Sequence, residues 1–139
     1  MVEKKTKGRK RHIITDTQSH ILAVEIHAAN IHDTTAGPSI VEKACEQHPS
    51  IQAICGDAGY RKTTKNYVEN IRKLRMDISQ KIAQKGWNVI PKRWAVERAF
   101  AWLNNSRRLS KDYETDPFSS ENFVMISHAM TILARFSTP

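Results

Sequence analysis

Short apolar runs and polar turns alternate at the start of the chain, a pattern that predicts a β-hairpin. Residues 9–15 and 21–27 are rich in β-branched side chains, as strands usually are. Residues 16–20 between them, Asp-Thr-Gln-Ser-His, are typical of a turn. We therefore expect the two strands to pair with each other. Residues 1–8 are polar and lysine-rich and are expected to form a flexible basic tail.

Helical and strand periods alternate over the rest of the chain. After a loop at 28–37, Pro38 is expected to open a helix that ends near His48. The inward side chains of this helix would be Ile40, Val41, Ala44 and Cys45. The later predicted elements are a strand at 51–55, a helix around 67–74, a strand at 76–82, a helix at 92–103 and a helix at 121–136. This order indicates one α/β domain with a mixed sheet.

The helix predicted at 92–103 places an acid beside an apolar stripe. No glycine or proline interrupts it, and Pro91 just before it suits the first turn of a helix. At 100° per residue, three apolar side chains share one face that should be buried, namely Val96, Phe100 and Leu103. Glu97 lies at the edge of this face. Its carboxylate could serve a site where a polyanion docks, or it could form an ordinary surface ion pair with Arg93 one turn earlier.

Composition adds a strong positive charge. Twenty-two Lys and Arg against 14 Asp and Glu give a formal net charge of +8, which indicates a polyanionic partner, nucleic acid first. The basic residues form two groups, Lys4, Lys5, Lys7, Arg9, Lys10 and Arg11 near the N-terminus and Lys92, Arg93, Arg98, Arg107, Arg108 and Lys111 further along. A solvated basic tail would explain the first group equally well.

Other classes of protein are disfavoured. The two cysteines have no metal-binding spacing, and the six histidines are scattered, so we interpret the histidines as surface or packing residues. No apolar run approaches the roughly 20 residues of a membrane-spanning helix. We expect a soluble intracellular protein. A metal-dependent hydrolase of small substrates would leave the basic groups unexplained.

Asp57 is the second acid of interest. It follows the apolar strand at 51–55 and lies between Gly56 and Gly59. Functional side chains of α/β sheets gather beyond the carboxyl ends of strands, and a carboxylate there can bind a hard cation. An aspartate close to glycines is also a common turn former. The position alone leaves both interpretations open.

Four longer motifs stand in order along almost the whole chain. They are GRKRHIITDT (8–17), HAANIHD (27–33), GDAGY (56–60) and PKRWAVERAFAWLNNSRRLSKDYE (91–114), of which the last is long and specific. Together they resemble the C-terminal part of DDE-type transposases of bacterial insertion sequences, the group related to insertion sequence five. The resemblance implies a ribonuclease-H-like fold and a triad of two Asp and one Glu that holds two divalent metals. Its second acid matches Asp57, and its third matches Glu97 with the Arg93-x-x-x-Glu97 spacing intact.

The resemblance also implies an activity, metal-dependent cleavage and strand transfer at transposon ends, in the bacterial cytoplasm at the nucleoid. Two Mg²⁺ or Mn²⁺ ions about 3.5–4 Å apart would clamp the attacking and leaving oxygens of an in-line displacement. The expected DNA-binding residues are Arg9, Lys10, Arg11, Lys92, Arg93, Trp94, Arg98, Arg107 and Arg108. Trp94 could instead pack within the protein, as is expected of Trp102. Expected partners are transposon and target DNA, a second copy of the chain, or the rest of the transposase.

The match departs from the family at two points. The family's first Asp lies on an opening strand upstream of the segment that matches residues 8–17. Neither that Asp nor that strand is expected in this sequence, so residues 1–139 would form a truncated domain. Asn104 and Asn105 also stand where the family usually has a basic residue. A site that lacks one metal ligand should be impaired alone. The alternative is a non-catalytic DNA-binding or regulatory protein, whose exposed sheet edge would invite another chain.

Overall fold

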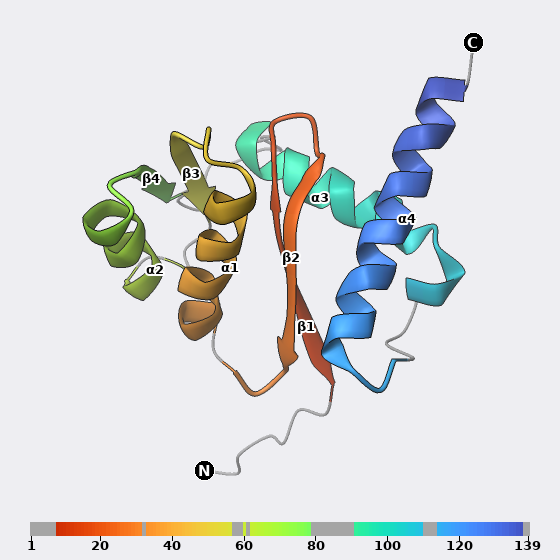
Figure 1. The fold of residues 1–139 in the computed structure, drawn as a ribbon, viewed down its shortest axis with the longest axis horizontal. Helices are drawn as coiled ribbons and strands as arrows, with labels where there is room; N and C mark the ends of the chain where they lie inside the picture. The colour runs from red at the N-terminus through yellow and green to blue at the C-terminus, as the bar shows by residue number, and fades with distance from the viewer. Residues whose placement is uncertain are drawn as a thin grey trace, which may run out of the picture.

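The computed structural model describes residues 8–31, 33–56, 60, 62–78, 91–109 and 114–137, which form a mixed α/β structure. Its elements are β1 (Arg9–Thr15), β2 (Ile21–Ala28), α1 (Asp33–Gln47), β3 (Ala53–Gly56), α2 (Thr63–Asn66), the π-helical turn η2 (Tyr67–Ile71), β4 (Arg75–Ile78), α3 (Pro91–Asn104), the 3₁₀ turn η3 (Arg107–Leu109) and α4 (Pro117–Ser137). The described strands form two separate sheets of two strands each, β1–β2 and β3–β4. Figure 1 shows the long hairpin in the middle of the molecule, with α1 on one side and α4 on the other.

The predicted hairpin is confirmed. β1 and β2 pair antiparallel from Arg9 opposite Ala28 onward, with an irregularity between Ile14 and Thr15. Asp16 organises the turn, because its Oδ1 accepts the backbone N–H groups of Gln18 and His20, each at 2.9 Å.

The Asp16 carboxylate also contacts the His20 ring, with 2.9 Å between Oδ2 and Nδ1. Burial alone would raise the pKa of Asp16, but the hydrogen bonds from His20 and Gln18 outweigh it, and the pKa is lowered. Asp16 therefore has a structural role in the turn.

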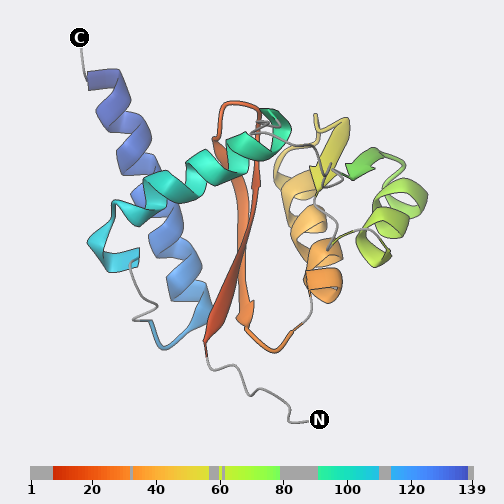
Figure 2. The same ribbon diagram turned by 180° about the vertical axis from the view of Figure 1, so that it is seen from behind.

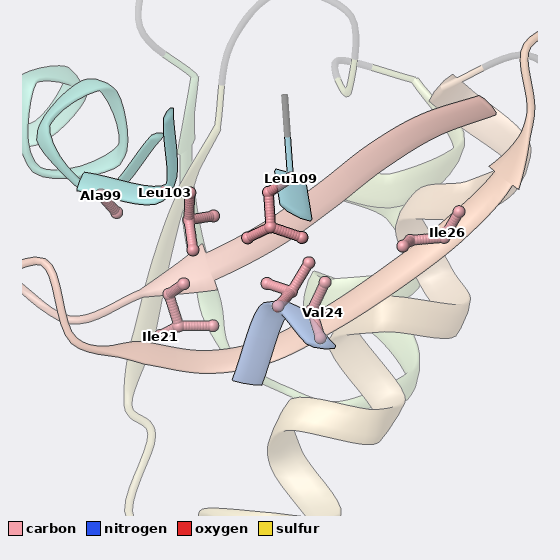
Figure 3. Close-up of a cluster of buried hydrophobic side chains, with 7 residues drawn as sticks. Ile21, Val24, Ile26, Ala99, Leu103 and Leu109 are labelled. Carbon is pink, nitrogen blue, oxygen red and sulfur yellow. The ribbon is translucent and has the colours of Figure 1, made fainter. Parts of the chain in front are cut away.

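The main core lies between β2, α3 and α4. Its buried side chains are Ile21, Val24, Ile26, Ala99, Leu103, Leu109 and Val124 (Figure 3). On the opposite face of β2, Ala23 packs against Ile40 and Ala44 of α1. The alternation of Val24 and Ile26 with Ala23 shows the period of two that a strand covered on both faces requires.

The buried face of α3 differs from the predicted one. Leu103 is buried as expected, but Val96 and Phe100 are only partly buried, and the other buried positions are Ala95 and Ala99. The prediction gave most weight to the large apolar side chains. The small alanines, spaced four residues apart, instead share the buried face with Leu103.

The start of α1 was also predicted wrongly. The helix begins at Asp33, so the loop predicted at 28–37 ends earlier, and Pro38 lies inside the helix rather than at its first turn. Gly37 is buried against α2, and a Cβ atom there would lie 2.9 Å from the Cβ of Thr64. Tertiary packing of α1 on α2 thus continues the helix through a Gly-Pro pair that locally favours a break.

The side chains predicted to face inward from α1 agree with the structure. Ile40, Val41 and Ala44 are buried, and Cys45 is partly buried beside the cluster of Val41, Val68 and Met76.

The two short strands differ from prediction mainly at their ends. β3 and β4 pair in parallel, from Ala53 opposite Arg75 to Gly56 opposite Ile78. The predicted strands were 51–55 and 76–82, and residues 79–82 lie outside the described part of the chain. α4 starts at Pro117, before the predicted 121, since Asp116 Oδ1 accepts the N–H of Phe118 at 3.3 Å and caps the helix.

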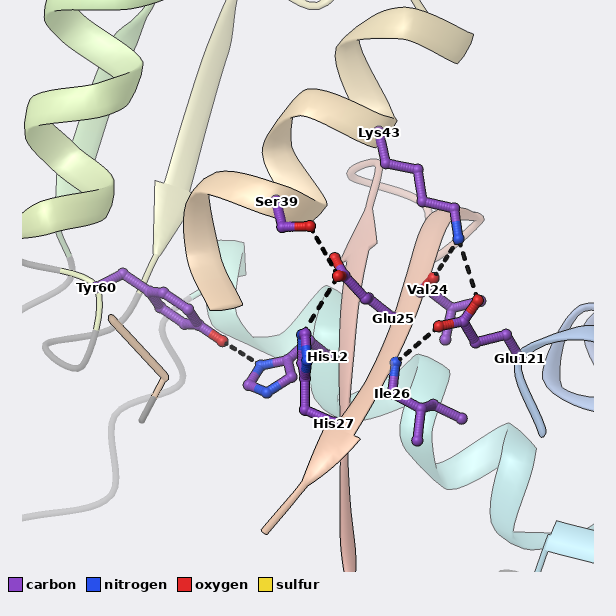
Figure 4. Close-up of polar contacts among 9 residues, drawn as sticks. All are labelled: His12, Val24, Glu25, Ile26, His27, Ser39, Lys43, Tyr60 and Glu121. Carbon is purple, nitrogen blue, oxygen red and sulfur yellow. Dashed lines mark hydrogen bonds and ion pairs between the residues drawn. The ribbon is translucent and has the colours of Figure 1, made fainter. Parts of the chain in front are cut away.

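Side chains of the flanking helices close the outer edge of β2. The Val24 carbonyl accepts from Lys43 Nζ at 2.9 Å, and the Ile26 N–H donates to Glu121 Oε1 at 3.0 Å (Figure 4). The Ile21 N–H donates to Nε2 of His128 at 2.9 Å. Burial lowers the pKa of His128, with smaller effects from the charges of neighbouring groups. The neutral ring is the form that can accept this hydrogen bond.

Candidate functional site

α3 carries the acid on which the candidate site depends. Glu97 is exposed on this helix, which lies across the turn end of the hairpin (Figure 2). The next residue, Arg98, holds the helix to the turn, because its Nε donates to the Oγ of Ser19 at 2.8 Å. Ser19 is completely buried and has a positive φ of 69°. The orientation of α3, and so of Glu97, is tied to the hairpin turn.

A cavity of about 630 Å³ is lined by Val96, the residue that precedes Glu97 on α3. We call it the β1–β3 cleft, and its lining includes Ile13 and Ile14 of β1, Ile54 and Cys55 of β3, and Ala95 and Val96 of α3. Glu97 directly follows Val96, and Asp57 follows Cys55 by two residues. The cleft therefore joins the residues that lead into both predicted acids. Asp57 itself lies outside the described residues.

The tryptophans of α3 stack with arginines. The Arg98 guanidinium lies 4.3 Å from the ring centroid of Trp94 and 5.0 Å from that of Trp102, and Arg135 of α4 lies 4.8 Å from Trp102. Trp102 is partly buried between two guanidinium groups, an environment that suits packing. Trp94 remains 46% exposed and still presents ring surface to solvent.

Two of the predicted DNA-binding residues, Arg9 and Arg11, form hydrogen bonds within the protein. Arg9 donates to the backbone carbonyls of Glu114 and Thr115 at 2.8 and 2.6 Å, and Arg11 donates to that of Leu109 at 3.0 Å. These contacts fasten β1 to the segments that surround η3, more than 90 positions away in sequence.

The other basic candidates are nearer to solvent. Arg108 pairs with Glu114, with 2.7 Å between Nε and Oε1, and Lys10 Nζ reaches the Ile31 carbonyl at 3.4 Å. Arg107 is exposed on η3. Lys92 and Arg93 stand on the first turn of α3, and their side chains lie outside the described part of the structure.

A buried polar cluster was missed at the sequence level, where its histidines were interpreted as surface or packing residues. His12 is buried on β1, its Nδ1 lies 2.9 Å from the hydroxyl of Tyr60, and its ring centroid is 5.3 Å from that of His27 (Figure 4). Glu25 joins the cluster, with its Oε1 3.4 Å from His27 Nε2 and 2.7 Å from the Ser39 hydroxyl.

Tyr60 belongs to the GDAGY motif that contains Asp57. Its contact with His12 therefore anchors the end of this motif to β1. The available signal in the sequence was the alternation of Glu25 and His27 on one face of a predicted strand.

Neither a metal cluster nor a membrane span is found in the described segments. No group of three or more His, Cys, Asp or Glu residues among them could hold a metal ion. Glu97 is the member of the predicted acid pair that these segments contain. None of the described helices is long and apolar enough to cross a bilayer.

Comparison with known proteins identifies the class of this α/β structure. Residues 2–132 match the family model described as the transposase DDE domain, so the chain belongs to that family. The chain is also 28% identical over 114 residues to a Burkholderia cepacia protein titled "Putative transposase for insertion sequence element IS402", a match that covers 77% of this chain and 54% of the relative. The chain thus spans about half the length of that relative. No solved structure gave a significant match.

Proposed function

We propose that this chain contributes two acids, Asp57 and Glu97, to a transposase site that cleaves and joins DNA at transposon ends, on a ribonuclease-H-like fold. The family match over residues 2–132 is the observation that carries the proposal. The β1–β3 cleft supports it, because this one cavity is lined by Val96, directly before Glu97, and by Cys55, two residues before Asp57. The narrower relation to the group of insertion sequence five is part of the same proposal.

Glu97 and Asp57 would bind Mg²⁺ or Mn²⁺, hard cations that prefer oxygen ligands. Such ions activate the attacking oxygen and stabilise the leaving oxygen in phosphoryl transfer. Glu97 is exposed on α3, the helix around which DNA would bind. The resemblance locates no third acid in these 139 residues, so this ligand set is incomplete in itself.

The DNA-binding surface would surround α3. Arg107 is exposed on η3, and Trp94 presents ring surface on which a base could stack. Lys92 and Arg93 would add charge at the start of α3, close to Glu97. Arg98 and Arg108 would contribute charge while they keep their contacts with Ser19 and Glu114. The same holds for the remaining basic candidates, Arg9, Lys10 and Arg11, on β1.

The decisive experiment replaces Glu97 in a complete transposase that contains these residues. Glu97→Gln removes the charge but keeps the size of the side chain. Cleavage of transposon ends should fall by more than about 100-fold, because replacing even a residue that only orients a metal ligand lowers metal affinity or activity about 10–100-fold. Binding to the ends should persist. Glu114→Gln, which alters the pair with Arg108, is the matched control and should still cleave. Wild-type cleavage by Glu97→Gln would show that Glu97 is not a ligand.

A non-catalytic DNA-binding or regulatory role is the second candidate. Its support is the net charge of +8 together with the incomplete set of acids. The two candidates differ in one assay, incubation of the purified chain with supercoiled plasmid and Mg²⁺. Nicking would favour the catalytic role, and salt-sensitive binding without nicking would favour the second. Binding that does not weaken with salt would contradict both, because phosphate contacts release counterions.

A further inference from the structure

We propose that the outward face of α4 pairs antiparallel with the same face of a second copy of this chain. We call this face the α4 stripe. Its exposed residues are Phe118, Met125, Ile126, Ala129, Leu133 and Phe136. At 100° per residue, all six positions fall within about 100° of one another around the helix axis. The inference goes beyond the proposed function and does not rest on it, because it requires neither DNA nor metal.

The α4 stripe is large for an exposed apolar surface. Its five large side chains are between 38% and 84% exposed, and Met130 beside it is 66% exposed. At roughly 100 Å² for each large side chain, the stripe presents about 500 Å², near the upper end of the largest apolar patch on a typical monomer. Two stripes in contact would bury roughly 1,000 Å², which is enough for a specific interface between two proteins.

The charged residues of α4 lie off this stripe. They are Glu121 and Arg135. Glu121 accepts hydrogen bonds from the Ile26 N–H and from Lys43, and Arg135 stacks on Trp102. A face without Lys or Arg does not suit DNA, and helices that bind membrane surfaces usually carry several basic residues on their polar side. The partner of the α4 stripe is therefore expected to be an apolar protein surface.

The spacing of residues along the stripe indicates that this surface is another helix. Asn122, Ile126, Ala129, Leu133 and Phe136 are separated by four, three, four and three positions. This is the alternation that lets two helices pack along a common seam. Figures 1 and 2 show that the last turns of α4 extend beyond the rest of the described fold, so a second helix can lie along them. A second copy carries the same seam, and a two-fold axis would bring the two seams together.

A cavity beside the first half of α4 can receive a side chain of the second copy. It has a volume of about 210 Å³, and its lining includes Phe118 and Met125 of α4, Lys43 of α1 and Leu22 of β2. A cavity of about 150 Å³ in a protein can hold benzene. The ring of Phe136, which is 84% exposed near the end of α4, would therefore fit into this cavity of the second copy.

An antiparallel pair brings Phe136 to the cavity. With the two-fold axis through the middle of the stripe, Asn122 lies opposite Leu133 of the second copy, and Phe118 lies beside its Phe136. A parallel pair would place each residue opposite itself and leave the cavity unfilled. The antiparallel pair also keeps the two folds, each with a net charge of +8, at opposite ends of the helix pair, where they repel each other less. It aligns the two helix dipoles favourably as well.

The first experiment measures the molar mass of the purified 139-residue chain by size-exclusion chromatography with light scattering, over a series of concentrations. A dimer with twice the 15.9 kDa of one chain is expected. Leu133→Glu should raise the Kd of the dimer at least about 100-fold, because the two-fold axis places the new charge in the interface twice. Ala134→Glu, at an exposed neighbouring position outside the stripe, is the matched control and should leave the Kd unchanged. Circular dichroism spectra of both variants should match the wild type, since both positions are exposed.

The second experiment tests the antiparallel arrangement by disulfide formation. Asn122→Cys is introduced into one chain and Leu133→Cys into another, and the exposed Cys55 is replaced by Ser in both. When the two chains are mixed and oxidised, they should crosslink to each other several-fold more than either chain crosslinks to itself, because disulfides require close Cα atoms.

Several outcomes would overturn the proposal. One is the mass of a single chain at about 100 μM, a concentration at which a micromolar Kd gives mostly dimers. Others are a dimer that Leu133→Glu leaves intact or that Ala134→Glu weakens equally, and crosslinking of each cysteine chain mainly to itself. Binding of a monomeric chain to vesicles of phosphatidylcholine and phosphatidylglycerol, lost in Leu133→Glu, would identify a lipid surface as the partner instead. These assays contain neither DNA nor metal, so their failure is distinct from that of the Glu97 experiment.

Discussion

Arg98 and Arg107 were both predicted to bind DNA, but the structure leads us to expect different consequences when they are changed. Arg98 connects α3 to the hairpin turn through Ser19 and stacks against Trp94 and Trp102. Arg107 is exposed on η3. We expect Arg98→Lys, which keeps the charge, to lower stability with little effect on DNA affinity. Arg107→Ala should weaken DNA binding.

The size of the Arg98 effect follows from its contacts. A hydrogen bond from a charged donor contributes about 1.5–3 kcal/mol, and each cation–π contact about 0.5–1 kcal/mol. Lysine retains part of the stacking energy but has no planar group to place at Ser19. Arg98→Lys should therefore lower the free energy of unfolding by about 1–3 kcal/mol. This is a large part of the roughly 5–15 kcal/mol of a typical domain.

Two measurements separate the effects. Urea denaturation followed by circular dichroism gives the free energy of unfolding of each variant. Binding to duplex DNA at several salt concentrations gives the slope of log K against log salt. Arg107→Ala should make this slope shallower by about 0.9, the value for one phosphate contact. If Arg98→Lys unfolds with the wild-type midpoint, the contact with Ser19 does not stabilise the protein.

Three further changes test other parts of the structure. Tyr60→Phe removes the hydroxyl next to His12 Nδ1, so in a complete transposase it should slow cleavage several-fold while DNA binding stays the same. Equal cleavage by the variant and the wild type would show that this contact does not support the site. Gly37→Ala should lower the melting temperature although alanine favours helices, because its Cβ would lie 2.9 Å from the Cβ of Thr64; a higher melting temperature would contradict this packing. The pKa of His128 is lowered by burial, so its contribution to stability is complete above the usual pKa of 6.5 and is lost as the pH falls below 6.5 through the lowered pKa of the folded state. Denaturation midpoints of the wild type should therefore fall more between about pH 7.5 and 5.5 than those of His128→Gln, and parallel curves would refute this assignment.

The elements that the sequence predicted well are those fixed by local interactions. The hairpin follows from two β-branched runs and a turn in which Asp16 bonds within four residues. The buried positions of α1 follow from helical spacing once the helix is recognised. Such features need no information about the rest of the fold.

The features that prediction missed depend on contacts distant in sequence. α1 continues through Gly37 because α2 packs against it there. The contact of His12 with Tyr60 spans 48 positions, and that of Arg9 with Glu114 spans 105. For the candidate site, the helix α3 that carries Glu97 could be predicted from a local pattern. The contact of Arg98 with Ser19, which links α3 to the hairpin turn, could not be predicted from such a pattern.

α3 connects the candidate acid to the β1–β3 cleft. Ala95, Ala99 and Leu103 are its buried positions, and Arg98 fixes its orientation at the turn. Val96 faces the cleft, and Glu97 follows it directly. β3, which also lines the cleft, leads into Asp57. Under the proposed function, the separation of the two carboxylates therefore depends on how α3 and β3 border this cleft.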